Sequence, residues 1–404
     1  MATIYVAKTG NDGNAGTDPG SPKLTIQSAV DAADDSSPAV VIILDSNTYN
    51  EEIQLGRDGG FNFQSITVKG DTGQLPIIDG NGLTGHGAFR SGGIRGGGLS
   101  INTIQNIKFI RCGGANGMLR GDNGGDGGCY LISDCEFESN TTFVIARTEG
   151  DASDHTVVNR CKFVDNTSNL VRQLGGGGSP DMFCDFTNCV FGLREGVEGI
   201  NFGNGPVNGT VKNCSFVTNV DTAGSHIIQA GVIENNVIQS LSSTSNEVIG
   251  IKAHSSRSNN ATFGNFATAQ TGGTDGGNNL IGQDPLFTDT TLSNPDLQFD
   301  KASPLRNAGK TIAGITTDFN GTARPQETGY DIGAFEFVYW MSADNPEGDE
   351  TKFGPNGFEI RSIKRKLASR IFPAGEENRQ APYHITIPGP VNLRGRKTPY
   401  KSET

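Results

Sequence analysis

The chain has 404 residues, a net charge of −12, 57 glycines and only 34% hydrophobic residues. No run approaches the roughly 18 apolar residues that a membrane-spanning helix needs, which excludes a helical membrane protein. So small an apolar fraction favours a solenoid, whose thin core follows one axis, over a layered α/β domain.

Residues 1–57 predict a cap at the start of a larger domain. Residues 3–6 and 40–44 are apolar runs of strand length. Between them, the apolar residues of 25–33 recur at helical spacing behind helix-start residues, and a polar Asp-Asp-Ser-Ser-Pro run ends the pattern. We expect this helix to cover the open edge of the first sheet. No signal peptide precedes the first strand, so the sequence predicts a protein that is not secreted by that route.

Residues 58–280 repeat one structural unit. A Cys two positions before a Phe recurs at steps of 25 to 28 residues. Apolar residues at alternate positions predict half-buried strands, and a period of this length indicates stacked coils. We expect eight or nine coils with one inner column of Cys and another of Phe. The pairs are Cys135/Phe137, Cys161/Phe163, Cys189/Phe191 and Cys214/Phe216.

The residue before each Cys is a second repeated feature. Asn and Asp dominate this position and tolerate left-handed backbone, which predicts a tight corner between two strands of each coil. The corner residues are Asp134, Arg160, Asn188, Asn213 and, in the next coil, Asn235 and Asn236.

The seven cysteines predict a packed core of reduced thiols rather than disulfides or a metal centre. Only Cys129/Cys135 and Cys184/Cys189 approach the spacing of zinc ligands, and no His accompanies either pair. We therefore expect no metal and no cofactor, in a protein that is made and assembled in cytoplasm.

Two segments resemble known proteins. The first contains Thr-Gly-Asn-Asp at 9–12 and Thr-Ile-Gln-Ser-Ala-Val at 25–30, and it resembles the start of pectate-lyase-like β-helix proteins. The second contains Asp-Pro-Leu-Phe at 284–287 and Asp-Ile-Gly-Ala-Phe-Glu at 331–336. It is similar to a closing module at the C-terminal end of bacterial and phage β-helix proteins. The resemblance implies an all-β fold: a single-stranded right-handed parallel β-helix with an N-terminal capping helix, a closing module over 281–337 and an extended C-terminal arm.

Residues 338–404 predict that arm. The segment is rich in Gly, Pro and charge, and it has too little apolar surface to order itself. Residues 361–404 hold 10 Lys or Arg and 3 Asp or Glu, a charge of +7, so the other 360 residues carry −19. We expect the arm to bind neighbouring proteins of an assembly. Its candidate contact residues are Arg361, Lys364, Arg365, Lys366, Arg370, Tyr383, Arg394, Arg396 and Lys397.

One further set of residues is a candidate binding face. Arg120, Arg147 and Arg172 follow the Phe of their coils by 11, 10 and 9 residues, so stacking predicts that they share a face. Asp122 and Glu149 are candidates to neutralise them. Such a face suits an acidic sugar or a partner's carboxylates, and the more common alternative is a salt-bridged outer surface. No residue is assigned a catalytic role, because no catalytic signature of β-helix enzymes is evident.

The leading functional hypothesis is a structural virion protein, a phage capsid-decorating or head or tail appendage subunit. Residues 338–404 would attach it to capsid or tail proteins, and the resemblance favours a homotrimer assembled in the host cytoplasm. The alternative is a polysaccharide lyase or hydrolase of tailspike or cell-surface type that acts on acidic glycans of a host surface. Enzymatic activity is left open, with a non-enzymatic role favoured. Nucleic-acid binding by the arm ranks third, because the acidic body repels DNA.

Overall fold

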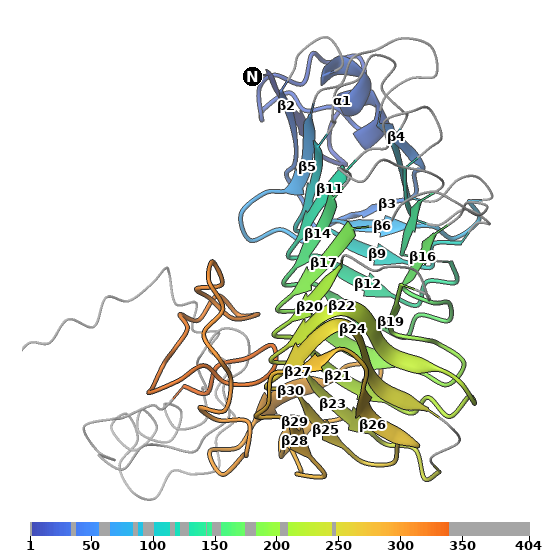
Figure 1. The fold of residues 1–404 in the computed structure, drawn as a ribbon. Coiled ribbons are helices and arrows are strands. Elements are labelled where there is room, and N and C mark those ends of the chain that lie inside the picture. The colour runs from blue at the N-terminus through green and yellow to red at the C-terminus, as the bar shows by residue number, and fades with distance from the viewer. Residues whose placement is uncertain are drawn as a thin grey trace, which may run out of the picture. The chain divides into compact units, whose positions relative to one another are not determined.

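The computed structural model describes residues 2–33, 38–55, 65–83, 88–91, 101–113, 118–121, 129–142, 144–147, 155–173, 183–202, 209–244 and 248–338. Its strands form three parallel sheets, A, B and C, that wind around one axis (Figure 1). The earlier coils add strands to all three sheets, whereas every described strand of the solenoid after residue 173 belongs to sheet A or sheet B. The predicted all-β parallel β-helix is therefore confirmed, with ten strands in sheet B.

Sheet A contains β1 (Ala2–Val6), β2 (Ala39–Ile43), β5 (Ile66–Gly70), β8 (Ile101–Gln105), β11 (Cys129–Ser133), β14 (His155–Asn159), β17 (Phe183–Thr187), β19 (Ile200–Asn201), β20 (Thr210–Lys212), β22 (His226–Glu234), β24 (Ile249–Ser258), β26 (Thr268–Thr271) and β27 (Thr274–Asp275). Sheet B contains β3 (Thr48–Tyr49), β6 (Ile77–Asp79), β9 (Lys108–Ile110), β12 (Glu136–Glu138), β15 (Lys162–Val164), β18 (Val190–Leu193), β21 (Ser215–Thr218), β23 (Val237–Ser240), β25 (Ala261–Phe263) and β28 (Leu280–Ile281). Sheet C contains β4 (Ile53–Leu55), β7 (Phe89–Ser91), β10 (Leu119–Gly121), β13 (Ile145–Arg147) and β16 (Val171–Gln173). A separate antiparallel pair joins β29 (Phe287–Asp289) to β30 (Asp296–Phe299).

The predicted capping helix is confirmed as α1 (Ile26–Ala33), which packs against β1, β2 and β4. Its four apolar residues at helical spacing are all buried, because they face the first coil. The Thr25 hydroxyl accepts a hydrogen bond from the Ser28 N–H (3.2 Å), as expected of an N-cap residue. The helix thus shields the end of the solenoid at which the chain begins (Figure 1).

The Phe column predicted from the repeat is present inside the solenoid. Phe109, Phe137, Phe163, Phe191 and Phe216 stack almost parallel, with ring centroids 4.2–5.0 Å apart. Register sets this spacing, because equivalent residues of neighbouring coils are about 4.8 Å apart across a sheet. All five rings are buried and form the longest continuous part of the core.

The predicted Cys column lies beside the Phe column, and its thiols are free and buried. The Cys161 thiol lies 3.8 Å from the Ile132 carbonyl of the preceding coil, a weak hydrogen bond. Towards the C-terminal end the same position becomes Asn236 and then Asn260. The Cys214 N–H donates to the Asn236 side-chain oxygen (2.9 Å), and the Asn236 N–H donates to that of Asn260 (3.0 Å). The core therefore changes from a thiol column to an asparagine ladder without a change of register.

The predicted corners are confirmed by left-handed backbone at every position named from the sequence before a Cys. A second corner, at the end of the sheet B strands, was not predicted. It places Arg111, Ser139 and Asp165 at φ values of 52–56°, and buried Asn140 and Asn166 follow as a shorter ladder. Sequence reasoning missed this corner because its residue types vary more than those of the first.

The closing module, residues 281–337, lies against the outer face of sheet B rather than beneath the last coil. Its Leu297, Phe299, Leu305 and Ile332 form a second core with outward side chains of sheet B. Those partners are Val190, Val217, Val237 and Ala261. The contact is close: a side-chain carbon added at Gly192 would meet the Leu292 carbonyl oxygen at 2.1 Å.

Candidate functional site

The arginines proposed from the sequence occupy sheet C. Arg120 is in β10, Arg147 in β13 and Arg172 in β16. Register aligns Arg120 with Ala146 and Ala146 with Arg172, so these two arginines belong to one column. Arg147 instead aligns with Gly121, one position along the strand. The expectation that the three arginines stack together is therefore wrong for Arg147, because it lies one residue beyond Ala146, the position that the register places in this column.

Register also adds an arginine that the sequence analysis did not select. Arg90 in β7 aligns with Arg120, and Gln54 in β4 aligns with Arg90. The coil that contains Arg90 lacks the Phe from which the arginine positions were counted in the sequence. The Phe-to-Arg spacing therefore did not select Arg90. Asp122 and Glu149, the expected neutralising carboxylates, lie outside the described residues, as do the nine candidate residues of the arm.

A polar cluster lies on strands nearer the C-terminal end of the solenoid. Register aligns Asn201 of β19 with Gln229 of β22 and Lys252 of β24. The Glu198 carboxylate accepts hydrogen bonds from Asn201 (2.8 Å) and Asn169 (3.1 Å) side-chain amides. These three strands and the residues just before β16 and β19 therefore bring carboxylate, amide and ammonium groups together.

Two histidines complete this polar cluster. The Gln229 amide and the His254 ring contact each other at 3.1 Å between Nε2 atoms. His226 has both ring nitrogens buried, and neither has a hydrogen-bond partner among the described residues. Burial lowers the pKa of His226, and nearby Lys252 and His254 lower it further, while Glu198 opposes them. His226 is therefore a neutral imidazole at neutral pH. Sequence reasoning treated each His singly and so missed that His226 and His254 lie about one coil apart.

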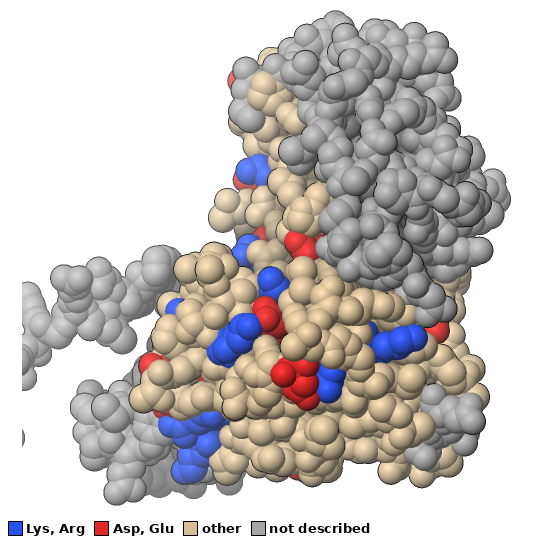
Figure 2. Space-filling view, in the orientation of Figure 1, with Lys and Arg blue, Asp and Glu red and all other residues tan. Residues whose placement is uncertain are grey.

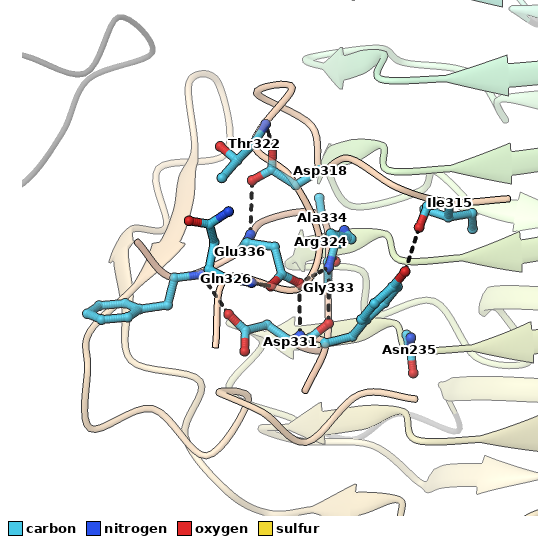
Figure 3. Close-up of polar contacts among 12 residues, drawn as sticks. Asn235, Ile315, Asp318, Thr322, Arg324, Gln326, Asp331, Gly333, Ala334 and Glu336 are labelled. Atoms are coloured by element: carbon cyan, nitrogen blue, oxygen red, sulfur yellow. Dashed lines mark hydrogen bonds and ion pairs between the residues drawn. The ribbon is translucent and has the colours of Figure 1, made fainter. Parts of the chain in front are cut away.

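A buried polar group of the closing module is the clasp, defined as Asp318, Arg324, Asp331 and Glu336 (Figure 3). The Arg324 side chain is fully buried and donates to Glu336 (2.6 Å). It also donates to the Gly333 carbonyl (2.7 Å) and reaches the Asn188 side-chain oxygen on the solenoid (3.4 Å). Arg324 thus connects the module's own loops to a corner of the β-helix.

The carboxylates of the clasp accept backbone hydrogen bonds. Asp331 accepts from the N–H groups of Asn307 and Phe337, each at 2.6 Å, and Asp318 accepts from the Glu336 N–H (2.9 Å). Burial raises the pKa of Asp331 to about 7, and it raises the pKa of Asp318 as well. Three acids around one guanidinium leave an excess of negative charge, so the clasp binds a proton more readily than isolated carboxylates do.

The left-handed corner residues have a second role at this junction. The side-chain amide of Asn235 donates to the Lys310 carbonyl (2.8 Å), and its oxygen accepts from the Lys310 N–H (2.9 Å). Asn188 donates to the Thr317 carbonyl and Asn259 to the Ala308 carbonyl. Three of the four coils from Asn188 to Asn259 therefore hold the closing module through the same corner position. The fourth corner residue, Asn213, has no side-chain hydrogen bond among the described residues.

Ionic groups elsewhere on the solenoid pair between neighbouring coils. Arg160 bonds Asp134 (2.7 Å), Lys108 bonds Glu136 (3.3 Å), and Arg257 bonds Asp275 (2.8 Å). Figure 2 shows basic and acidic side chains in small mixed groups on a largely uncharged face. In the part of the chain that the structure describes, no three His, Cys, Asp or Glu side chains are placed to hold a metal ion. No helix there is long and apolar enough to cross a membrane.

Comparison with solved structures gives eight matching chains, which include the following two. The structure of pectate lyase Pel9A matches with a TM-score of 0.43 and 15% identity, over 83% of this chain and 96% of that one. The complex of XylC with xylose matches with a TM-score of 0.30 and 10% identity, over 83% and 98%. No family model matches the sequence, and no curated protein does so either.

Proposed function

We propose that this chain is a structural subunit of a larger particle, a phage capsid-decorating or head or tail appendage protein. The observation that carries the proposal is the division of charge. The 44 C-terminal residues carry +7 and the other 360 residues carry −19. A basic segment attached to an acidic body suits a role in which the segment binds an acidic neighbour and the body projects from it.

The construction of the body supports this role. Its ion pairs link one coil to the next, its core runs as continuous columns, and its last coils carry a bonded module. A stack of this kind resists bending because each coil is fixed by two neighbours. Rigidity of the body and charge on the arm are the properties that a projecting subunit needs. Under this proposal the subunit forms a homo-oligomer, with a trimer favoured, and binds capsid or tail proteins.

The test compares the full chain with a chain that ends at residue 340, each carrying the same N-terminal tag. Both are expressed in cells that produce the parent particle, and copies per purified particle are counted by quantitative mass spectrometry. We expect the shortened chain to be absent from particles while its thermal transition is unchanged. Particles that hold the shortened chain at full copy number would contradict the proposal.

A charge variant separates basic attraction from other contacts of the arm. Arg394→Glu, Arg396→Glu and Lys397→Glu together should lower the copy number, because they reverse three positive charges in a four-residue stretch. Thr398→Ala, at the residue directly after this stretch, is the matched control and should leave the copy number unchanged.

A second candidate function is binding or cleavage of an acidic polysaccharide on sheet C. The observation that favours it is the register column of Arg90, Arg120 and Arg172, because arginine at one strand position of several coils suits a repeating carboxylate polymer. Arg120→Ala with Arg172→Ala should weaken binding of polygalacturonate measured by calorimetry. Arg194→Ala, in a surface ion pair just after β18, is the control. Equal binding by all three proteins would dismiss this candidate.

A further inference from the structure

The two ends of the solenoid differ in how they are covered. At the first coil, α1 lies over the sheet edge formed by β1. At the last coil, β26 and β27 end sheet A and β28 ends sheet B, and no described strand pairs with their outer edges. Figure 1 shows this end at the bottom, with the closing module beside it rather than beneath it. A row of backbone N–H and C=O groups is therefore left open to another strand.

The last coil has few of the residues that usually prevent another strand from pairing with an open sheet edge. Natural edges are blunted by charged side chains or by proline, because both discourage strand pairing. Residues 264–283 contain no Lys, Arg, Glu or Pro. Their one charged residue, Asp275, bonds the Arg257 side chain at 2.8 Å and is neutralised. Ile281 is 60% exposed, the largest value among the exposed large hydrophobic residues that the structure describes.

A buried polar atom at the same end also lacks a partner. Gln270 of β26 donates to the Asn260 carbonyl (3.2 Å) and so fills the interior of the last coil. Its side-chain oxygen is buried and accepts no hydrogen bond from the described residues. A buried acceptor without a donor costs about 1–3 kcal/mol, so a donor from beyond the last coil would stabilise this end.

We propose that the last coil, residues 264–283, is an end-to-end interface with a second copy of this chain. The neutrality of this face favours a second copy of this chain as the partner that binds it. In a twofold contact the same surface faces its own copy, so a face with net charge would repel itself, whereas this face is neutral. A twofold axis through the β26 edges also sets them antiparallel, which allows paired backbone hydrogen bonds and continues sheet A across the junction. If three chains form the basic unit, the same contact joins two trimers.

The experiment measures the native mass of the full chain by sedimentation velocity over a concentration series. The variant Ile281→Lys with Thr274→Lys puts four like charges across the junction, at residues that are exposed in the single chain. We expect it to halve the native mass from an even multiple of 42.6 kDa. Leu131→Lys, 40% exposed on the outer face of β11, is the matched control and should keep the native mass.

The dependence of the native mass on salt distinguishes a second copy of this chain from a basic segment bound at the last coil. A neutral strand junction should hold its mass as ionic strength rises, whereas a basic segment bound to this end would be released. The proposal is overturned if the full chain sediments as a single 42.6 kDa species, or if the end variant keeps the wild-type mass. It is also overturned if the Leu131→Lys control dissociates equally, or if salt alone dissociates the wild-type assembly.

Discussion

The outer face of sheet B has two regions that share one backbone and differ in their side chains. On β9 and β12 three of the four outward residues are charged, and the partly exposed Lys108 bonds Glu136 and Glu138. On β18, β21 and β23 the outward residues are Val190, Val217 and Val237, all buried under the closing module. Lys162 marks the boundary, where it donates to Asn294 of the module (2.7 Å). The difference shows that the side chains at outward positions depend on what covers them, while the register of the sheet stays the same.

The largest expected effect is at the clasp. Arg324→Ala removes the guanidinium group and leaves the three buried carboxylates of the clasp without a positive partner. We therefore expect a loss of about 3–5 kcal/mol in the free energy of unfolding. Urea unfolding of the full chain measures it. Arg194→Ala removes an arginine that is 50% exposed in its pair with Asp165, and it should cost less than about 1 kcal/mol. Equal losses would mean that the module contributes no more than a surface ion pair.

The next largest effect on stability is expected at the asparagine ladder inside the solenoid. Asn236→Ala removes an acceptor for the Cys214 N–H and a donor to the Val211 carbonyl (2.8 Å), so we expect a loss of about 1–3 kcal/mol. Cys161→Ala, in the same column, removes only a weak thiol contact and should cost about 1 kcal/mol. Urea midpoints of the two variants compare them. A larger loss for Cys161→Ala would show that the thiol column is the stronger part of the core.

A smaller effect is expected from pH. The pKa of Asp331 is about 7 in the folded chain and near 3.8 when unfolded, so the folded state binds more protons between these values. Stability from this group is complete below pH 4 and is lost as pH rises towards 7. The melting temperature of the full chain should therefore fall between pH 5 and pH 7.5. Asp331→Asn should flatten that slope, and an unchanged slope would remove Asp331 as its source.

The smallest effect is expected on the uncovered half of sheet B. Lys108→Ala breaks an exposed pair with Glu136 and Glu138, and we expect less than about 1 kcal/mol. Thermal unfolding at low and high salt measures this loss, and high salt should remove the difference in stability between Lys108→Ala and the wild type. A loss comparable with that of Arg324→Ala would remove the contrast between the two regions.

The sequence predicts the solenoid well because its signals are local and repeat. The Cys and Phe pairs and the corner Asn residues each recur once per coil, so one correct interpretation places many strands. Side-chain columns are harder to predict, because spacing counted from another strand can miss the aligned position by one residue, as for Arg147.

The site of the closing module could not be placed from the sequence. Its bonds to Asn188, Asn235 and Asn259 join residues 49 to 136 positions apart. One signal was available: outward positions of sheet B change from Lys and Glu to Val and Ala along the repeat. The polar cluster was missed for the same reason as the clasp, since His226, Gln229 and Lys252 come together only through register.

The central claim of this account is that the closing module and the last coils form one cooperative unit. Hydrogen exchange of the full chain, read by mass spectrometry, tests it directly. The N–H groups of Lys310, Gly333 and Ala334 donate to the solenoid, so they should exchange as slowly as those of β21 and β23. Arg324→Ala should speed exchange in the module and in these strands together. Fast exchange of the module over a protected solenoid would contradict the claim.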